Sequence, residues 1–236
     1  FLVKETKRIF KVSANVGGFL ARTATKNILG ISNDKLPIEL TELLGNLKGP
    51  IMKVAQILAT IPEALPKEYA QQLSKLQAEA PSMNWLFVKR RMKNELGIDW
   101  LNSFYSFEKV ARKAASLGQV HKAIIKKNMQ SVACKLQYPD MEAAIKADLK
   151  QLKLILKIYK QIDNSIITED IYDELKERLI EEVDYEREAR HISYYNMIFK
   201  KNNFINIPNT ISSLSTSKLL TMSWLDGKPL SNFYKQ

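Results

Sequence analysis

The chain has 236 residues, of which 45% are hydrophobic and 26% are charged, a composition that excludes an intrinsically disordered protein. Its single cysteine, Cys134, excludes an internal disulfide framework and fits a reducing compartment. The formal net charge of +11 allows an anionic partner, such as nucleic acid, an anionic membrane surface or a phosphorylated ligand. No nucleic-acid-binding motif accompanies the basic residues, so we expect no nucleic-acid partner, and a solvated basic surface explains the charge equally well.

The first hundred residues have helical periodicity and no strand pattern. A loosely amphipathic helix or a poorly ordered arm is expected over residues 1–32, followed by helical stretches separated by prolines and glycines. Pro50 suits the first turn of one such helix, and a basic helix over Trp85–Leu96 ends at Gly97. We therefore predict a helical N-terminal extension over residues 1–100. No apolar run reaches the ~18 residues that would span a bilayer.

The pattern changes after residue 100. Alternating side chains predict three short strands, with a turn at Lys126–Asn128, and these are Phe104–Val110, Gln119–Ile125 and Gln130–Leu136. Two helices and two further strands are predicted next, at Asp140–Ile162, Thr168–Lys200, Thr210–Ile211 and Lys218–Trp224. This order predicts an α+β fold over residues 101–236, with a small antiparallel sheet.

The segment Lys113–Val120 has some of the spacing of a kinase phosphate loop, G-x-G-x-x-G-x-V. Gly118 and Val120 match the last glycine and the valine, whereas Ala115 and Lys113 occupy the other two glycine positions. Each added Cβ limits how closely the backbone N–H groups can approach a phosphate. Alone, this alanine-rich segment favours an ordinary β-turn.

Lys135 lies fifteen residues after Val120, in the sequence Val132-Ala133-Cys134-Lys135, which is similar to the V-A-I-K strand of kinases. Apolar neighbours on such a strand would bury the stem of the lysine, and a buried ammonium needs an anionic partner. The alternative is an edge-strand lysine that points into solvent. Loop and strand together, at this spacing, favour a nucleotide-binding lysine.

Two further groups of polar residues have no specific meaning by themselves. Five carboxylates lie within residues 181–188, and on a continuous helix Asp184 and Glu188 would share a face, with Glu182 well around it. Neighbouring arginines would neutralise this group as a solvated helix face. Lys53 and Gln56, three residues apart on the helix from Pro50, are most simply surface residues.

Four segments nevertheless resemble the motifs of the UbiB (aarF/ADCK) atypical kinase-like family, in order and in spacing, across about residues 40–230. They are Lys53–Gln56, Ala114–His121, Lys135–Pro139 and Glu182–Tyr185. The resemblance implies a protein-kinase-like N-lobe that follows the helical extension and runs to the hinge. We expect this chain, which begins at Phe1, to be part of a longer protein whose C-lobe, with the catalytic loop, is missing here.

The resemblance also implies roles for individual residues. Lys135 would contact the nucleotide phosphates with Glu188 as its partner, and these two are the predicted catalytic residues. Lys53 and Gln56 would form the family's K-x-G-Q motif, with Ala55 in place of the glycine, and Glu182 and Asp184 its E-x-D motif. All four would be regulatory, Glu182 pairing with Lys53. The nucleotide would be held by Ala114, Ala115, Ser116, Gly118, Val120, Lys135, Met222 and Trp224, the last two at the hinge.

The implied ligand is ATP or ADP with Mg²⁺, whose ligands would lie mostly in the C-lobe, Asp184 being the only candidate within this chain. The intact protein would be an ATPase or phosphotransferase that supports ubiquinone biosynthesis. A quinone-precursor lipid, an anionic membrane surface and quinone-biosynthesis proteins are the expected partners. The expected location is the cytoplasm, peripheral to a bacterial inner membrane, or the mitochondrial matrix side. The alternative is a nucleotide-sensing, lipid-binding scaffold without phosphoryl transfer, and a third reading is a helical domain with no ligand.

Overall fold

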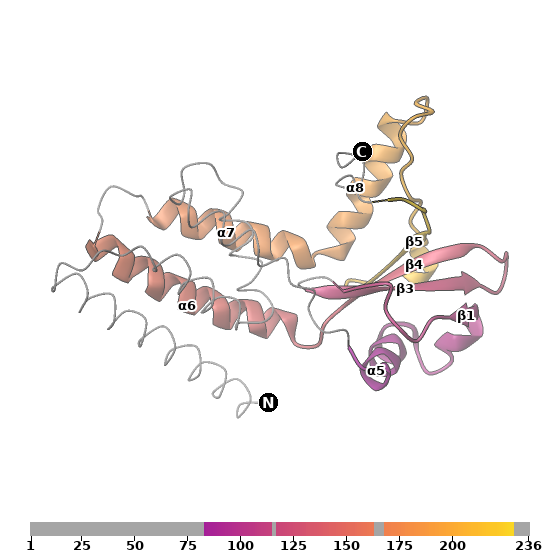
Figure 1. Ribbon diagram of the computed structural model, residues 1–236, viewed down its shortest axis with the longest axis horizontal. Coiled ribbons are helices and arrows are strands. Elements are labelled where there is room, and N and C mark those ends of the chain that lie inside the picture. The colour runs from indigo at the N-terminus through magenta and orange to yellow at the C-terminus, as the bar shows by residue number, and fades with distance from the viewer. Residues whose placement is uncertain (1–82, 115–116, 163–167, 229–236) are drawn as a thin grey trace. The chain divides into compact units, whose positions relative to one another are not determined.

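The computed structural model describes residues 83–114, 117–162 and 168–228 (Figure 1). They fall into two compact units. The sheet unit comprises residues 83–114, 118–138 and 184–228, and the helix-pair unit comprises residue 117 with residues 139–162 and 168–183. Four of the predicted site residues, Lys53, Gln56, Ala115 and Ser116, lie outside the described residues, as does most of the predicted extension.

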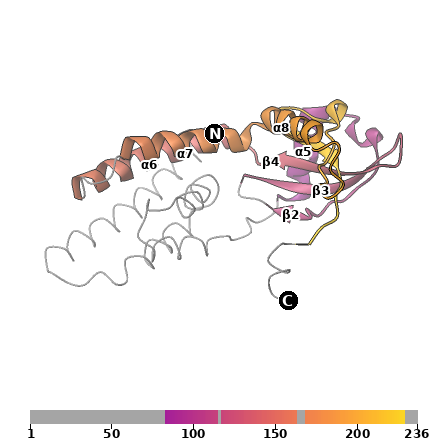
Figure 2. The same cartoon turned by 90° about the horizontal axis from the view of Figure 1, so that it is seen from above.

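The sheet unit contains a five-stranded antiparallel sheet in the order β1-β3-β4-β5 (Figure 1), with β2 paired to β3 (Figure 2). The strands are β1 (Phe104–Phe107), β2 (Lys113–Ala114), β3 (Gly118–Ile125), β4 (Ser131–Gln137) and β5 (Leu219–Ser223). The predicted small antiparallel sheet is thereby confirmed. The first strand ends three residues earlier than predicted, and the predicted strand Thr210–Ile211 is only an isolated bridge between Thr210 and Met222.

One face of the sheet is closed by helix α5 (Trp85–Leu96), which belongs to the extension predicted over residues 1–100. Its start is capped by the Asn84 side chain, which accepts a hydrogen bond from the Leu86 N–H (2.7 Å), and it ends at Gly97, with φ of 89°. Its buried side chains pack with those of the sheet in one hydrophobic core, which includes Val88, Met92, Trp100, Phe104, Val132, Cys134, Leu136 and Leu219.

His121 is buried in this face within a chain of hydrogen bonds. Its Nδ1 lies 2.7 Å from the Glu108 backbone oxygen, and its Nε2 lies 2.7 Å from Nε2 of Gln119. Because a carbonyl oxygen only accepts, Nδ1 carries the proton and Nε2 accepts from the Gln119 amide. The Gln119 Oε1 accepts in turn from the Met83 N–H (2.5 Å). Burial lowers the pKa of His121 below its usual value, against the opposing effect of the Glu108 carbonyl.

Stability is therefore expected to fall as the pH is lowered from about 6.5 towards the pKa of folded His121, because the unfolded chain binds the proton first. The slope of unfolding free energy against pH cannot exceed about 1.4 kcal/mol per pH unit for one group. Denaturant unfolding between pH 8 and pH 5 measures it. His121→Gln should flatten the slope, whereas His191→Gln, at the exposed second histidine, should not. An unchanged slope in the His121 variant would contradict this assignment.

The helix-pair unit consists of α6 (Met141–Ile162) and α7 (Thr168–Val183). Apolar residues at helical spacing on both helices form its core, namely Ile145, Leu149, Leu152, Leu175 and Leu179. The predicted helix Asp140–Ile162 is confirmed to within one residue. No helix of the described residues is both long enough and apolar enough to cross a membrane.

The predicted single helix Thr168–Lys200 is wrong, because it breaks at Asp184 into α7 and α8 (Tyr185–Ile198). Asp184 has φ of −87° and ψ of 84°, and its Oδ1 accepts a hydrogen bond from the Arg187 N–H (2.8 Å) as the N-cap of α8. The break therefore separates Glu182, on α7, from Asp184 and Glu188, which lie one turn apart at the start of α8, where the Glu188 N–H donates to the Asp184 backbone oxygen (3.0 Å).

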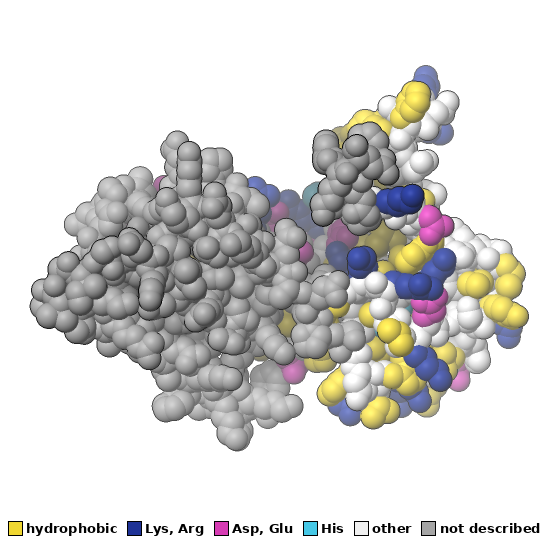
Figure 3. Space-filling model, in the orientation of Figure 1, with side chains coloured by type: hydrophobic (Ala, Val, Ile, Leu, Met, Phe, Trp, Pro, Cys, Tyr) yellow, Lys and Arg dark blue, Asp and Glu magenta, His cyan; other side chains and the backbone are white. Residues whose placement is uncertain are grey.

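Beyond the middle of α8, several large apolar side chains are exposed to solvent. They continue into the segment that follows the helix, where Lys200 and Lys201 are also exposed. Figure 3 shows apolar and basic side chains together in this part of the molecule. We name this surface the α8 tip; it comprises Tyr194, Tyr195, Met197, Ile198, Phe204 and Ile205 with the two lysines. Phe204, at 96% exposure, is its most exposed apolar residue.

Candidate functional site

The candidate site lies on the sheet face opposite α5. The strand register places Val120, Lys135 and Leu220 directly beside one another on β3, β4 and β5. Ala133 and Met222 form the next such pair, on the same face, since side chains two positions apart on a strand point the same way. The predicted residues Val120, Lys135 and Met222 thus share one face. Ala133 and Leu220 were missed, although the alternation along their strands points to them.

Lys135 and Glu188 meet on this face. The Lys135 Nζ donates to both carboxylate oxygens of Glu188, at 2.8 Å and 2.7 Å, so the contact joins β4 to the first turn of α8. The two side chains are 23% and 33% exposed. A charge-assisted pair that is partly withdrawn from water is stronger than one on the open surface. The structure therefore brings together the two residues that the resemblance implied as partners.

Two further residues surround the ammonium group. The ring of Tyr185 lies against it, with 4.8 Å from Nζ to the ring centroid. Gly118 lies on the neighbouring strand, where a Cβ would collide with the Leu136 backbone oxygen and would lie 2.8 Å from the Tyr185 hydroxyl oxygen. Glycine at position 118 is therefore required by the close packing of β4 and Tyr185. The sequence had indicated Gly118 through its match to the phosphate-loop pattern, but it had not indicated the packing that requires glycine there. It had assigned no role to Tyr185.

The alanine-rich segment forms part of a hairpin. Ala114 pairs with Gln119, and Lys113 pairs with Val120, so β2 and β3 form an antiparallel pair on either side of the loop. The Arg112 N–H donates to the Val120 oxygen at 2.8 Å and extends this pairing. Lys113 is exposed. Strand β2 was not predicted, and residues 115 and 116 of the segment lie outside the described residues.

The predicted hinge is already engaged in backbone pairing. The Trp224 N–H donates to the Ser131 oxygen (3.0 Å), and the Ser223 N–H donates to the Asn209 oxygen (2.8 Å). The indole N–H of Trp224 donates to Asp226 (2.8 Å), and the Lys122 Nζ lies 4.7 Å from the Trp224 ring centroid. The N–H of Trp224 is thus not available to a ligand, and the next backbone donor along the chain is that of Leu225.

The two acidic motif residues have different surroundings. Asp184 caps α8 with one carboxylate oxygen, and Glu182 lies near the end of α7, partly buried. The predicted partner of Glu182, Lys53, lies outside the described residues. Among the described residues no group of three or more His, Cys, Asp or Glu side chains is arranged to hold a metal ion. Glu188 accepts from Lys135 with both of its carboxylate oxygens, and Asp184 uses one of its own on the Arg187 N–H.

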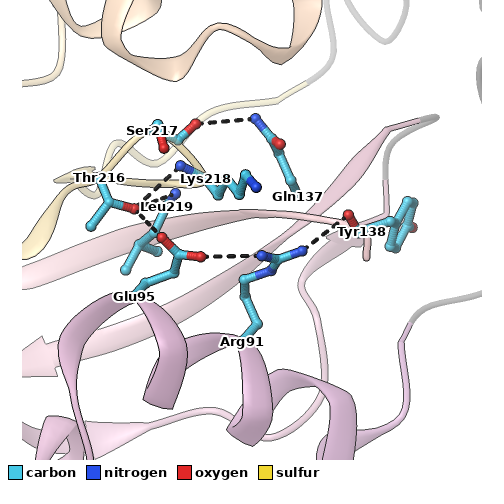
Figure 4. Close-up of polar contacts among 8 residues, drawn as sticks. All are labelled: Arg91, Glu95, Gln137, Tyr138, Thr216, Ser217, Lys218 and Leu219. Atoms are coloured by element: carbon cyan, nitrogen blue, oxygen red, sulfur yellow. Dashed lines mark hydrogen bonds and ion pairs between the residues drawn. The ribbon is translucent and has the colours of Figure 1, made fainter. Parts of the chain in front are cut away.

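A polar cluster ties α5 to the strands β4 and β5 (Figure 4). Glu95 accepts from Arg91 (3.1 Å) and from the Thr216 hydroxyl (2.6 Å), and Arg91 also donates to the Tyr138 backbone oxygen (3.3 Å). The Gln137 amide reaches the Ser217 backbone oxygen (3.3 Å). Among the described residues the Arg91 Nε has no hydrogen-bond partner, and we assign the cluster a structural role in holding α5 on the sheet.

A small antiparallel sheet with a lysine–glutamate pair between a strand and a helix defines a kinase-like N-lobe. The model of the ABC1 atypical kinase-like domain matches residues 75–236. The chain therefore belongs to the ABC1 atypical kinase-like family, the family of the UbiB and ADCK proteins.

Relatives in this family come from distant organisms. An uncharacterized protein in the hydrogenase 1 5′ region of Clostridium pasteurianum is 32% identical over 99% of this chain and 43% of its own length. The mitochondrial atypical kinase COQ8 of Saccharomyces cerevisiae is 27% identical over 93% of this chain and 46% of its own length. The Mycobacterium tuberculosis protein Rv3197, solved in complex with erythromycin, superposes with a TM-score of 0.57 at 32% identity, covering 86% of this chain and 54% of that one. The chain spans less than half the length of these two curated relatives.

Proposed function

We propose that this chain binds an adenine nucleotide, ATP or ADP, as the nucleotide lobe of an atypical kinase-like enzyme. The observation that carries the proposal is the two-bond contact of Lys135 with Glu188 on the sheet face opposite α5. In kinases such a pair fixes the lysine that contacts the α- and β-phosphates. Membership of the ABC1 family supports the same assignment.

The remaining residues of this face take roles that follow from their chemistry. Val120, Ala133 and Met222 supply apolar contact for the flat base, and Leu225 offers the backbone N–H that Trp224 cannot. On family resemblance, we propose that the loop of Ala114, Ala115 and Ser116, which ends at Gly118, approaches the phosphates. On family resemblance, we propose that Glu182 pairs with Lys53 and that Gln56 and Asp184 complete this regulatory contact. The intact protein would use Mg-ATP as an ATPase or phosphotransferase supporting ubiquinone biosynthesis.

Lys135→Ala is expected to weaken the binding of Mg-ADP to this chain at least tenfold, since a charge-assisted phosphate contact contributes about 1.5–3 kcal/mol. Glu188→Gln should weaken it less, because the lysine remains. Isothermal titration calorimetry measures both affinities, and Lys126→Ala, at an exposed turn lysine, is the matched control. Equal affinities in wild type and Lys135→Ala would refute the assignment. ATP turnover by the longer protein, with and without the same substitution, tests the enzymatic part.

The α8 tip favours a second candidate function, that of a scaffold on an anionic membrane. Its aromatic and aliphatic side chains stand beside Lys200 and Lys201, and no carboxylate lies between Glu188 and Asp226. Such a protein would be peripheral to the bacterial inner membrane or to the matrix side of a mitochondrial membrane, near a quinone-precursor lipid and quinone-biosynthesis proteins. Cosedimentation with anionic vesicles at low and high salt measures this binding. Binding without any ATP turnover by the longer protein would favour the scaffold.

A further inference from the structure

Tyr185 occupies a special position between the loop hairpin and the lysine–glutamate pair. It is the first residue of α8 and is only 2% exposed. The Asp184 cap holds the start of the helix, and Glu188 follows three residues later, on the same side of the helix as Tyr185. One helical turn therefore presents an aromatic ring and a carboxylate towards β4.

The aromatic face of Tyr185 and the carboxylate of Glu188 both contact the Lys135 ammonium. The ring centroid is 4.8 Å from Nζ, and the two Glu188 oxygens are 2.7 Å and 2.8 Å from it. A cation is attracted by the negative face of an aromatic ring, and the attraction grows as water is excluded. At 23% exposure the Lys135 side chain is mostly withdrawn from water. The ammonium is therefore held by two groups from one turn of α8.

The other end of the Tyr185 side chain reaches the base of the alanine-rich loop. Its hydroxyl oxygen lies 2.8 Å from the point that a Cβ on Gly118 would occupy, and Gly118 is the first residue of β3 after the loop. A single rigid side chain thus spans from the end of the loop to the ammonium, which restricts how the two groups move relative to each other.

We propose that Tyr185 is a positioning residue for Lys135. An ammonium has three N–H donors, and Glu188 takes two of them, so one remains for a phosphate oxygen. The ring restricts the ammonium to orientations in which two N–H groups point to Glu188 and the third remains for the phosphate oxygen. The identity of the ligand as a nucleotide phosphate rests on the proposed function, whereas the restraint of Lys135 by the ring does not.

The test replaces Tyr185 by phenylalanine and by phenylalanines with one, two and three ring fluorines, in the 236-residue chain. Fluorination preserves the ring's shape but weakens its negative face, so a space-filling role and an electrostatic role give different results. Two quantities are measured: the rate at which acetic anhydride modifies Lys135, followed by mass spectrometry, and the affinity for Mg-ADP. Melting temperatures establish that each variant is folded.

Tyr185→Phe is the reference for the series, and we expect the modification rate to rise stepwise with fluorine number above that reference, by about two- to fivefold in all. The affinity for Mg-ADP should fall in the same order. The same series at Tyr194, which is 64% exposed on the same helix, should leave Lys135 unchanged. A modification rate independent of fluorine number overturns the proposal. A rate that follows the series in a chain that does not bind Mg-ADP supports the positioning role and refutes the nucleotide function.

Discussion

Gly118→Ala is expected to lower the free energy of unfolding of the sheet unit by about 2 kcal/mol, and Gly118→Val by about 3 kcal/mol. The added Cβ would collide with the Leu136 backbone oxygen, which belongs to the neighbouring strand. That oxygen cannot withdraw without opening the ladder between β3 and β4. All three tryptophans lie in the sheet unit, so denaturant unfolding followed by tryptophan fluorescence reports on it directly.

Two variants separate this collision from a general effect of alanine. Gly227→Ala introduces a Cβ with nothing within 4 Å, and its effect should stay within about 0.5 kcal/mol. Adding Tyr185→Phe to Gly118→Ala removes only the hydroxyl contact, so most of the destabilisation should persist. If the alanine substitutions at positions 118 and 227 had equal effects, the close approach of β4 to Gly118 would be contradicted.

Glu95→Ala should destabilise the same unit by about 3 kcal/mol, because it leaves the Arg91 guanidinium partly buried without its carboxylate. The side chains of Arg91 and Glu95 are 13% and 12% exposed. The substitution also removes the acceptor of the Thr216 hydroxyl, which in turn orders the turn before β5 (Figure 4). Among the described residues the Arg91 Nε already has no hydrogen-bond partner, so little else can compensate.

The helix-pair unit offers a matched control for this ion pair. Arg178 and Glu174 have the same spacing along a helix, but their side chains are 58% and 47% exposed. Glu174→Ala should change the free energy of unfolding by no more than about 0.5 kcal/mol. Unfolding of this unit is followed by far-ultraviolet circular dichroism, because all three tryptophans lie in the sheet unit. Replacing both members of the buried pair, as Arg91→Met with Glu95→Leu, should recover most of the loss. A similar cost for Glu95→Ala and Glu174→Ala would contradict the dependence on burial.

Local patterns sufficed for most of the secondary structure. The helix Trp85–Leu96 was predicted to the residue, and both of its ends are set locally: the Asn84 side chain caps its start, and Gly97, which has no side chain, adopts the positive φ at its end. The strands β3 and β4 were predicted to within one residue from alternation. The break at Asp184 was not predicted, because the apolar spacing of a helix continues through it. An aspartate is common both on the surface of a helix and at an N-cap. Which of the two positions it occupies depends on its neighbours in the folded chain.

The site could be predicted from the residues only in part. Alternation and spacing indicated Val120 and Lys135, because each residue lies on a strand whose pattern is visible in the sequence of that strand alone. The partner Glu188 is 53 residues from Lys135 along the chain and was indicated by family resemblance alone. No local pattern indicated Tyr185, and the hinge prediction at Trp224 overlooked that its N–H pairs with Ser131. Contacts between distant segments depend on how strands register and where a helix begins.

The sequence by itself determined that the chain folds, in what order most of its helices and strands follow one another, and which family motifs it carries. Each of these depends on composition or on residues that are close together along the chain. Only the tertiary structure decided that α5 packs on the sheet, that the long helix divides at Asp184 and that Lys135 lies between a carboxylate and an aromatic ring. The physical reason is that burial and ion pairing are properties of the whole assembled core. A lysine has the same side chain on an exposed strand edge and in a nucleotide site, and its surroundings alone distinguish the two.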